Sequence, residues 1–176
     1  IFISDNIRMQ TISRKDPKPI SLENTLYIVG FVDGEGSFNI SFKIRTDYAN
    51  RIQVYPSFNI SQKERGILVW IQNQFGCGTI RNRGDGVYYY EVHNLRKLKE
   101  RIIPFFDRYK LRTKKKIAFE VFSKTIEIIS SKNLEWMDIK NIYVLREEVV
   151  VGRKRKYSLK DLEKFWKSSE TTRQIP

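Results

Sequence analysis

Two acidic residues lie in a glycine-rich stretch that follows an apolar run. Asp33 and Glu35 alternate with Gly34 and Gly36, and Gly30 lies four residues before Gly34. Residues four apart share one face of a helix, and without side chains they allow a second backbone to approach closely. Alternatively, these glycines fit against the chain's own sheet or end the helix. The spacing alone does not decide between the two.

A second copy of the chain is the natural partner for this face, because the apolar, glycine and acid pattern occurs once in the sequence. A two-fold axis through the contact sets Glu35 beside its mate from the other copy. Two adjacent carboxylates repel each other or share a proton unless a cation lies between them. A hard divalent ion such as Mg²⁺ suits oxygen ligands of this kind. The simpler interpretation of Glu35 is a solvent-facing carboxylate in a turn.

Outward positions of a predicted hairpin carry basic and amide side chains and no acid. Polar and apolar residues alternate over 37–45 and 51–60, which predicts two half-buried antiparallel strands, with Pro56 at an edge or a bulge. Such side chains read base edges, and a two-stranded ribbon fits the major groove. A solvated polar face is the alternative. The candidate DNA contacts are Asn39, Ser41, Lys43, Arg45, Arg51, Gln53, Tyr55, Ser57 and Asn59.

A second predicted hairpin, with strands over 79–83 and 87–92, extends the candidate face. Its first strand contributes Thr79, Arg81 and Arg83. The second strand is ambiguous, because aromatic residues occupy both of its alternating faces. We expect Tyr88 and Tyr90 to face the nucleic acid.

The densest positive charge lies between residues 108 and 116, where Asp107 is the only nearby acid. Basic side chains at the start of a helix oppose the helix dipole, so they need a compensating anion. Phosphate is the expected anion. The basic residues are Arg108, Lys110, Arg112, Lys114, Lys115 and Lys116.

Composition supports a folded protein that binds a polyanion. The 176 residues include 33 Lys and Arg against 20 Asp and Glu, a formal charge of +13, and 40% of the residues are hydrophobic. A single cysteine, Cys77, and a single histidine, His93, exclude a disulfide and a Cys/His zinc site within one chain. No apolar run approaches the ~18 residues of a membrane span. We therefore expect no membrane partner.

The order of predicted elements indicates an α+β fold. A helix near 21–34, the first hairpin, a helix over 63–75 and the second hairpin are followed by helices alone. We expect those helices over 95–106, 114–130, 134–148 and 159–166. This order divides the chain into a flexible arm (1–20), a core (21–130) and a C-terminal helical extension (131–176).

The segment Leu26–Phe38, LYIVGFVDGEGSF, resembles the signature of the LAGLIDADG homing endonucleases, and Ile28–Gly36 covers the nine-letter motif. Further similarities are FNISQK at 58–63, GCGTI at 76–80, IIPF at 102–105 and LRTKKK at 111–116. The resemblance covers roughly residues 21–129. It implies an αββαββα core with a saddle-shaped antiparallel sheet, here followed by C-terminal helices.

The resemblance also implies a homodimer, because the chain carries one motif. It assigns the metal to the Glu35 carboxylate and the Gly34 carbonyl, with Mg²⁺ as the ion and Mn²⁺ able to substitute. Asp33 takes a structural role at the helix end. The residues expected at the dimer interface are Ile28, Gly30, Phe31 and Gly34.

Two further residues receive catalytic roles from the resemblance. Gln62 corresponds to the position that orders active-site water, and Lys114 to the lysine near the scissile phosphate, with Lys116 as the alternative. Gly66 stands where the family commonly has a basic residue, and Arg65 is a candidate replacement.

The sequence therefore predicts a sequence-specific, metal-dependent DNA endonuclease that cuts double-stranded DNA at a long pseudo-palindromic site. An RNA maturase that assists intron splicing, with intron RNA as partner, is one alternative. A DNA-binding protein that has lost cleavage is the other. The resemblance implies an organellar location, in a mitochondrion or chloroplast.

Overall fold

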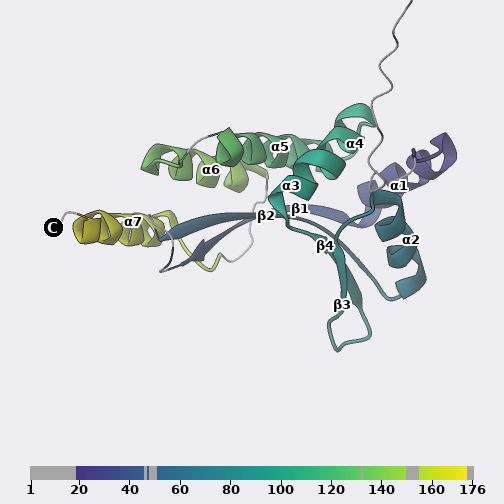
Figure 1. Ribbon diagram of the computed structural model, residues 1–176, viewed down its shortest axis with the longest axis horizontal. Coiled ribbons are helices and arrows are strands. Elements are labelled where there is room, and N and C mark those ends of the chain that lie inside the picture. The colour runs from purple at the N-terminus through teal and green to yellow at the C-terminus, as the bar shows by residue number, and fades with distance from the viewer. Residues whose placement is uncertain (1–18, 46, 48–50, 132, 150–154, 174–176) are drawn as a thin grey trace, which may run out of the picture.

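The structure, a computed structural model, describes residues 19–45, 47, 51–131, 133–149 and 155–173. Figure 1 shows the helices and strands along the chain. They are α1 (Leu22–Glu35), β1 (Gly36–Ile44), β2 (Ile52–Gln62), α2 (Arg65–Phe75), β3 (Thr79–Asn82), β4 (Tyr88–Val92), α3 (Leu95–Lys97), the π-helical turn η1 (Leu98–Ile102), α4 (Ile103–Arg108), α5 (Lys115–Ser131), α6 (Trp136–Val149) and α7 (Leu159–Arg173).

The strands form one antiparallel sheet of four strands in the order β1-β2-β4-β3. Alternation of apolar and polar residues fixes its register, since a slip by one residue would exchange the two faces. Pro56 pairs with Ile40 of β1, whereas β4 pairs with β2 only from Phe58 to Gln62. The expected edge position for Pro56 is therefore confirmed, because β2 has a neighbour on one side only at this point.

Aromatic rings fill the space between the sheet and its helices. Phe58 is fully buried, and its ring centroid lies 5.2 Å from that of Phe38 and 5.7 Å from that of Phe106. Phe75 of α2 and Tyr90 of β4 pack edge to face against the same ring. Close-packed aromatic residues of this size dominate the energy of a core.

Helices cover one face of the sheet. α3 to α6 lie above β1 and β2 in Figure 1, and the β3–β4 hairpin runs steeply away from them. α5 packs on β1 and β2, α2 packs on β4, and α1 contacts the first two strands. The α+β expectation and the saddle-shaped core are confirmed, and the opposite face of the sheet carries its polar residues.

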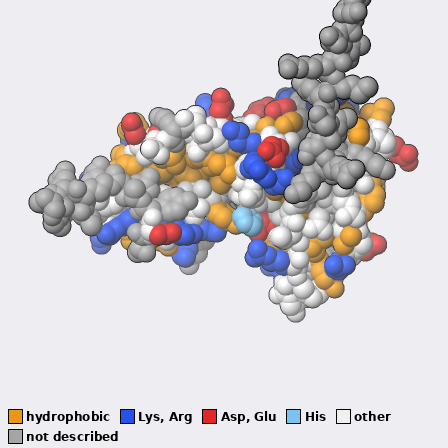
Figure 2. Space-filling model, viewed as in Figure 1, with side chains coloured by type: hydrophobic (Ala, Val, Ile, Leu, Met, Phe, Trp, Pro, Cys, Tyr) orange, Lys and Arg blue, Asp and Glu red, His pale blue; other side chains and the backbone are white. Residues whose placement is uncertain are grey.

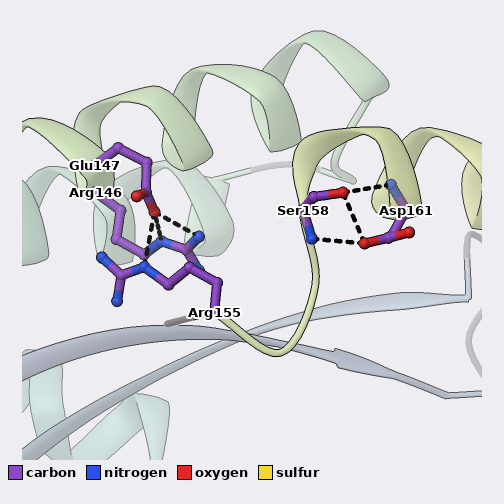
Figure 3. A network of polar contacts seen from close by, with 5 residues as sticks. All are labelled: Arg146, Glu147, Arg155, Ser158 and Asp161. Atoms are coloured by element: carbon purple, nitrogen blue, oxygen red, sulfur yellow. Dashed lines mark hydrogen bonds and ion pairs between the residues drawn. The ribbon is translucent and has the colours of Figure 1, made fainter. Parts of the chain in front are cut away.

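The C-terminal helices support the far part of the β1–β2 hairpin. Buried Arg146 of α6 packs against the rings of both Phe42 and Tyr143, with its guanidinium carbon 4.8 Å and 4.5 Å from their centroids. Figure 3 shows that Arg146 and Arg155 donate to the same oxygen of Glu147, at 2.8 Å and 2.9 Å. This network joins α6 to the segment before α7.

A reciprocal pair of hydrogen bonds starts α7. The Ser158 amide donates to Asp161 Oδ2 at 2.8 Å, and the Asp161 amide donates to Ser158 Oγ at 3.2 Å (Figure 3). Such capping satisfies backbone donors at a helix start. α7 extends to Arg173, beyond the expected end at 166, and its buried Leu162 and Trp166 join the core. Of the expected N-terminal arm (1–20), residues 1–18 lie outside the part of the chain that the structure describes.

The helix expected over 95–106 differs from a regular α-helix. Five residues of π-helical turn, Leu98–Ile102, interrupt it just before Pro104. Proline lacks an amide hydrogen and clashes with the preceding turn, so the helix widens where a regular hydrogen bond is lost.

Phe58→Ala should lower the free energy of unfolding by about 3–5 kcal/mol, because it removes the ring at the centre of the aromatic core and leaves a cavity. Urea unfolding followed by circular dichroism measures the change. The control is Ile117→Ala on α5, whose side chain is 56% exposed. Equal stabilities for the two variants would contradict this description of the core.

Candidate functional site

The end of α1 and the end of β2 meet at one corner of the sheet. Glu35 is the last residue of α1, and Gly36 starts β1 without an intervening loop. Gly36 pairs with Ile60, so the antiparallel register brings the exposed Glu35 carboxylate to the neighbourhood of Ser61 and Gln62. Register therefore brings together two of the three predicted catalytic residues.

Asp33 clamps the loop before α5 to the end of α1. Its carboxylate accepts hydrogen bonds from the Arg112 amide at 2.8 Å, the Thr113 amide at 3.2 Å and the Thr113 hydroxyl at 2.8 Å. Burial favours the protonated acid, but these hydrogen bonds outweigh it and hold the pKa of Asp33 below its usual value. This geometry agrees with a structural role for Asp33.

The clamp brings Lys115, rather than Lys114, to the end of α1. Lys115 Nζ donates to the Gly34 carbonyl oxygen at 2.5 Å and to the Val32 carbonyl oxygen at 3.2 Å. Burial lowers the pKa of Lys115, while the negative charges of Glu35 and Asp33 oppose that shift. Lys114 and Lys116 are exposed. The sequence assigned the catalytic lysine to 114, one residue before the side chain that reaches this corner.

The corner is suited to cations. Carbonyl oxygens at the C-terminal end of a helix carry partial negative charge, and here they already bind the Lys115 ammonium. The Gly34 carbonyl and the Glu35 carboxylate are hard oxygen donors of the kind Mg²⁺ prefers. Among the described residues, no group of three or more His, Cys, Asp or Glu side chains could enclose a metal.

The polar face of the sheet carries most of the predicted DNA contacts. In β1 and β2 the alternating register sets these side chains opposite the core, and Figure 2 shows groups of Lys and Arg along the lower side of the molecule. The contacts that the register assigns to this face are Asn39, Ser41, Lys43, Gln53, Tyr55, Ser57, Asn59, Thr79 and Arg81.

Some of these residues are less accessible than expected. Ser57 and Asn59 are only 6% and 3% exposed, and Asn59 Nδ2 donates to Ser57 Oγ at 3.0 Å. Arg51 turns toward α7, where its Nη1 donates to Ser168 Oγ at 3.4 Å. Arg45 was expected to contact DNA. In the structure its Nε donates to Oδ1 of Asp47, in the hairpin turn, at 2.8 Å.

The prediction for Tyr88 and Tyr90 is wrong. Tyr90 is fully buried, and its hydroxyl donates to the Cys77 carbonyl at 2.9 Å. Tyr88 packs against the same core. The opposite side of β4 carries Tyr89 and Glu91, which pair with Arg81 and Asn59 respectively. The apolar Val92 was the available signal, because residues 88, 90 and 92 share one face of a strand.

Sequence reasoning also missed a stack on the polar face. Lys43 Nζ lies 3.0 Å from the Tyr55 ring centroid, and the His93 ring stacks on Tyr55 at 5.4 Å. His93 Nδ1 lies 3.6 Å from Glu91 Oε2. These residues come from β1, β2 and the end of β4, and no pattern within a single strand indicates their contact.

α1 presents an apolar stripe to solvent. Leu22 and Leu26 are 66% and 61% exposed, and Gly30 and Gly34 continue their four-residue spacing with open space above them. Figure 2 shows apolar side chains at the right end of the molecule, over α1 and α2. Ile28 does not belong to this stripe. It is fully buried in the chain's own core, so its assignment to a dimer interface is wrong.

Within the part of the chain that the structure describes, no helix combines the length and apolar character needed to span a bilayer.

The comparisons with known proteins agree with this geometry. The family model described as LAGLIDADG endonuclease matches residues 28–126, more than half of the chain. Homing endonuclease I-ApeII of Aeropyrum pernix is 30% identical over 85% of this chain and 86% of its own length. A probable intron-encoded DNA endonuclease of Mycosarcoma maydis is 35% identical over 60% of this chain, which spans only 37% of that relative.

A solved structure extends the similarity to the fold. The archaeal intron-encoded homing endonuclease I-Vdi141I, complexed with DNA, superposes with a TM-score of 0.73 and 27% identity, over 84% of this chain and 96% of that one. The segment that the family model matches, residues 28–126, contains the C-terminal part of α1, the entire sheet and most of α5. The chain therefore belongs to the LAGLIDADG endonuclease family.

Proposed function

We propose that two copies of this chain form a metal-dependent homing endonuclease that cuts both strands of a long, pseudo-palindromic DNA site. One observation carries the proposal: an exposed carboxylate, Glu35, ends a helix with a bare glycine face, beside Lys115 and at the corner of a basic sheet. The polar sheet face supplies DNA contacts, and the corner supplies the chemistry. The DNA complex of I-Vdi141I supports the choice of ligand.

The exposed stripe on α1 supports the dimer. An apolar stripe of this kind needs a partner, and glycine permits two backbones to pack closely along it. A two-fold axis through the stripe joins two basic sheets into one long surface and sets the two Glu35 carboxylates together. Each half of the site is then read by the same side chains, which accounts for a palindromic target.

Three side chains divide the work at each scissile phosphate. Glu35 would hold the metal together with the Gly34 carbonyl, which now binds the Lys115 ammonium, and the bound ion would supply an activated water and positive charge at the phosphate. Lys115 adds a positive charge beside the phosphate, where negative charge develops during hydrolysis. Gln62 orients the water through its side-chain amide.

The remaining assignments rest on the resemblance. Mg²⁺ is the proposed ion, and the proposed organellar location is the one that the resemblance implies. The maturase alternative, with intron RNA as partner, stays a prediction.

Glu35→Gln should abolish cleavage of the target while leaving DNA affinity within a few-fold of wild type, because the sheet and lysine contacts supply most of the affinity. Cleavage in Mg²⁺ and binding by gel shift measure the two effects separately. The matched control is Glu127→Gln, on the exposed side of α5. Cleavage by Glu35→Gln at a rate near wild type in saturating Mg²⁺ would exclude Glu35 as the metal ligand.

Gly30→Leu should give a folded monomer that does not cut DNA. Gly30 has open space around it within one chain, so the larger side chain fits the monomer and even favours the helix. In the dimer it separates two backbones that must nearly touch. Sedimentation velocity measures the assembly, with Gly66→Leu on α2 as the helical-glycine control. A dimeric Gly30→Leu variant would show that the interface lies elsewhere.

Asp33→Asn should lower the stability of the folded chain by about 1–2 kcal/mol at neutral pH, because it weakens the hydrogen bonds that hold the loop before α5. The folded-state pKa of Asp33 is lowered. Its contribution is therefore present above the unfolded-state pKa, near 3.8, and is lost as the pH falls through the folded-state value.

Urea unfolding of wild type and Asp33→Asn at several pH values from 7 down to about 3 tests this linkage. The difference between the two proteins should shrink in the acid range. Asp107→Asn, at an exposed aspartate of α4, is the control. A difference that stays constant across the range would contradict the clamp.

A further inference from the structure

One acidic side chain lies within the polar face of the sheet. Across the four strands, all of them described, Glu91 is the only acid on this face. It belongs to a cross-strand row in which Ser37 pairs with Asn59, Asn59 with Glu91, and Glu91 with Thr79. A carboxylate in the middle of a surface that binds a polyanion is unfavourable unless it has a specific partner.

The neighbours of Glu91 hold it in place. Oε2 lies 3.6 Å from His93 Nδ1 and 4.0 Å from Arg81 Nη2, and the side chain is 13% exposed. Both distances exceed a hydrogen bond, so these pairs attract the carboxylate without using its lone pairs. His93 is itself stacked on Tyr55, which fixes one side of this arrangement.

An unsatisfied acceptor lies beside Glu91 in the row. Asn59 is 3% exposed, and its Oδ1 has no hydrogen-bond partner among the described residues, although its Nδ2 donates to Ser57. A buried acceptor without a donor costs free energy. Asn59 Oδ1 is buried, so the acceptor in this row that a ligand with a hydrogen-bond donor can reach is the partly exposed Glu91 carboxylate.

We propose that Glu91 reads a cytosine in the major groove, accepting a hydrogen bond from its N4 amino group. Guanine and thymine present acceptors in that groove, and these repel a carboxylate. Adenine offers an amino group but sets the N7 acceptor beside it, whereas cytosine offers only the donor. Glu91 also disfavours wrong sequences, because its carboxylate then faces a hydrogen-bond acceptor of the wrong base instead of the cytosine amino group.

The register places this cytosine in the inner part of each half-site. Ser37 lies two residues after Glu35, so the row of Glu91 is adjacent to the catalytic corner. Lys43 and Gln53 pair six residues further along β1, about 20 Å away at ~3.3 Å per residue. Glu91 should therefore act several base pairs closer to the two-fold axis than the hairpin tip.

The inference rests on the proposed function, and binding can be measured apart from cleavage. Wild type and Glu91→Gln are each used to select bound duplexes from a randomised DNA library. We expect the wild-type consensus to contain a cytosine at one inner position of each half-site. Glutamine pairs with adenine through N6 and N7, so Glu91→Gln should change that position to adenine with roughly tenfold or greater preference. Glu127→Gln should select the wild-type consensus.

A second measurement does not depend on how the variant folds. Wild-type protein is titrated against its consensus duplex and against the same duplex with pyrimidin-2-one, which lacks the amino group, in place of that cytosine. We expect roughly tenfold weaker binding to the altered duplex. Equal binding, or the same inner base selected by wild type and a folded Glu91→Gln dimer, would overturn the inference. Specific binding without cleavage of the consensus in Mg²⁺ would instead contradict the proposed nuclease.

Discussion

The direct passage of α1 into β1 is the constraint on which the rest of the site depends. The Gly36 amide donates to the Val32 carbonyl as the helix ends, and a Cβ on Gly36 would lie 2.5 Å from Val32 Cγ1. Only glycine fits there, so the helix and the strand meet without a loop. The position of Glu35 is thereby fixed relative to the sheet, and the sheet register then fixes the distance from its backbone to each strand residue on the polar face.

This junction also explains why a lysine from a distant part of the chain reaches the same place. Asp33 lies one turn before Gly36 and binds the backbone of residues 112 and 113, which precede α5. The first residue of α5, Lys115, then reaches the exposed carbonyl groups at the end of α1. A single carboxylate therefore sets the position of a cation that the local sequence of α5 would otherwise leave in solvent.

Most of the fold follows from periodicity. Alternation in β1 and β2 was sufficient to place these strands, and left-handed glycines, Gly76, Gly84 and Gly86, mark the end of α2 and the turn between β3 and β4. The predictions failed where the alternation of polar and apolar residues gives little information. Consecutive tyrosines in β4 fit either face, so Val92 was the one residue of the strand that indicated the buried face, and the close approach of Gly78 to Tyr90 agrees with it. Likewise, the sequence does not distinguish Lys114, Lys115 and Lys116. The hydrogen bonds of Asp33 to the preceding loop decide which of these lysines reaches the end of α1.

The support of the β1–β2 hairpin by α6 and α7 bears on how such a protein could evolve. Because these helices hold the far half of the hairpin through Phe42 and Arg146, the strands do not rely on their outward side chains for stability. Substitutions on the outer surface are then tolerated with little effect on folding. A lineage that invades a new host gene can therefore drift toward a different recognition sequence while the corner formed by α1 and β2 stays intact.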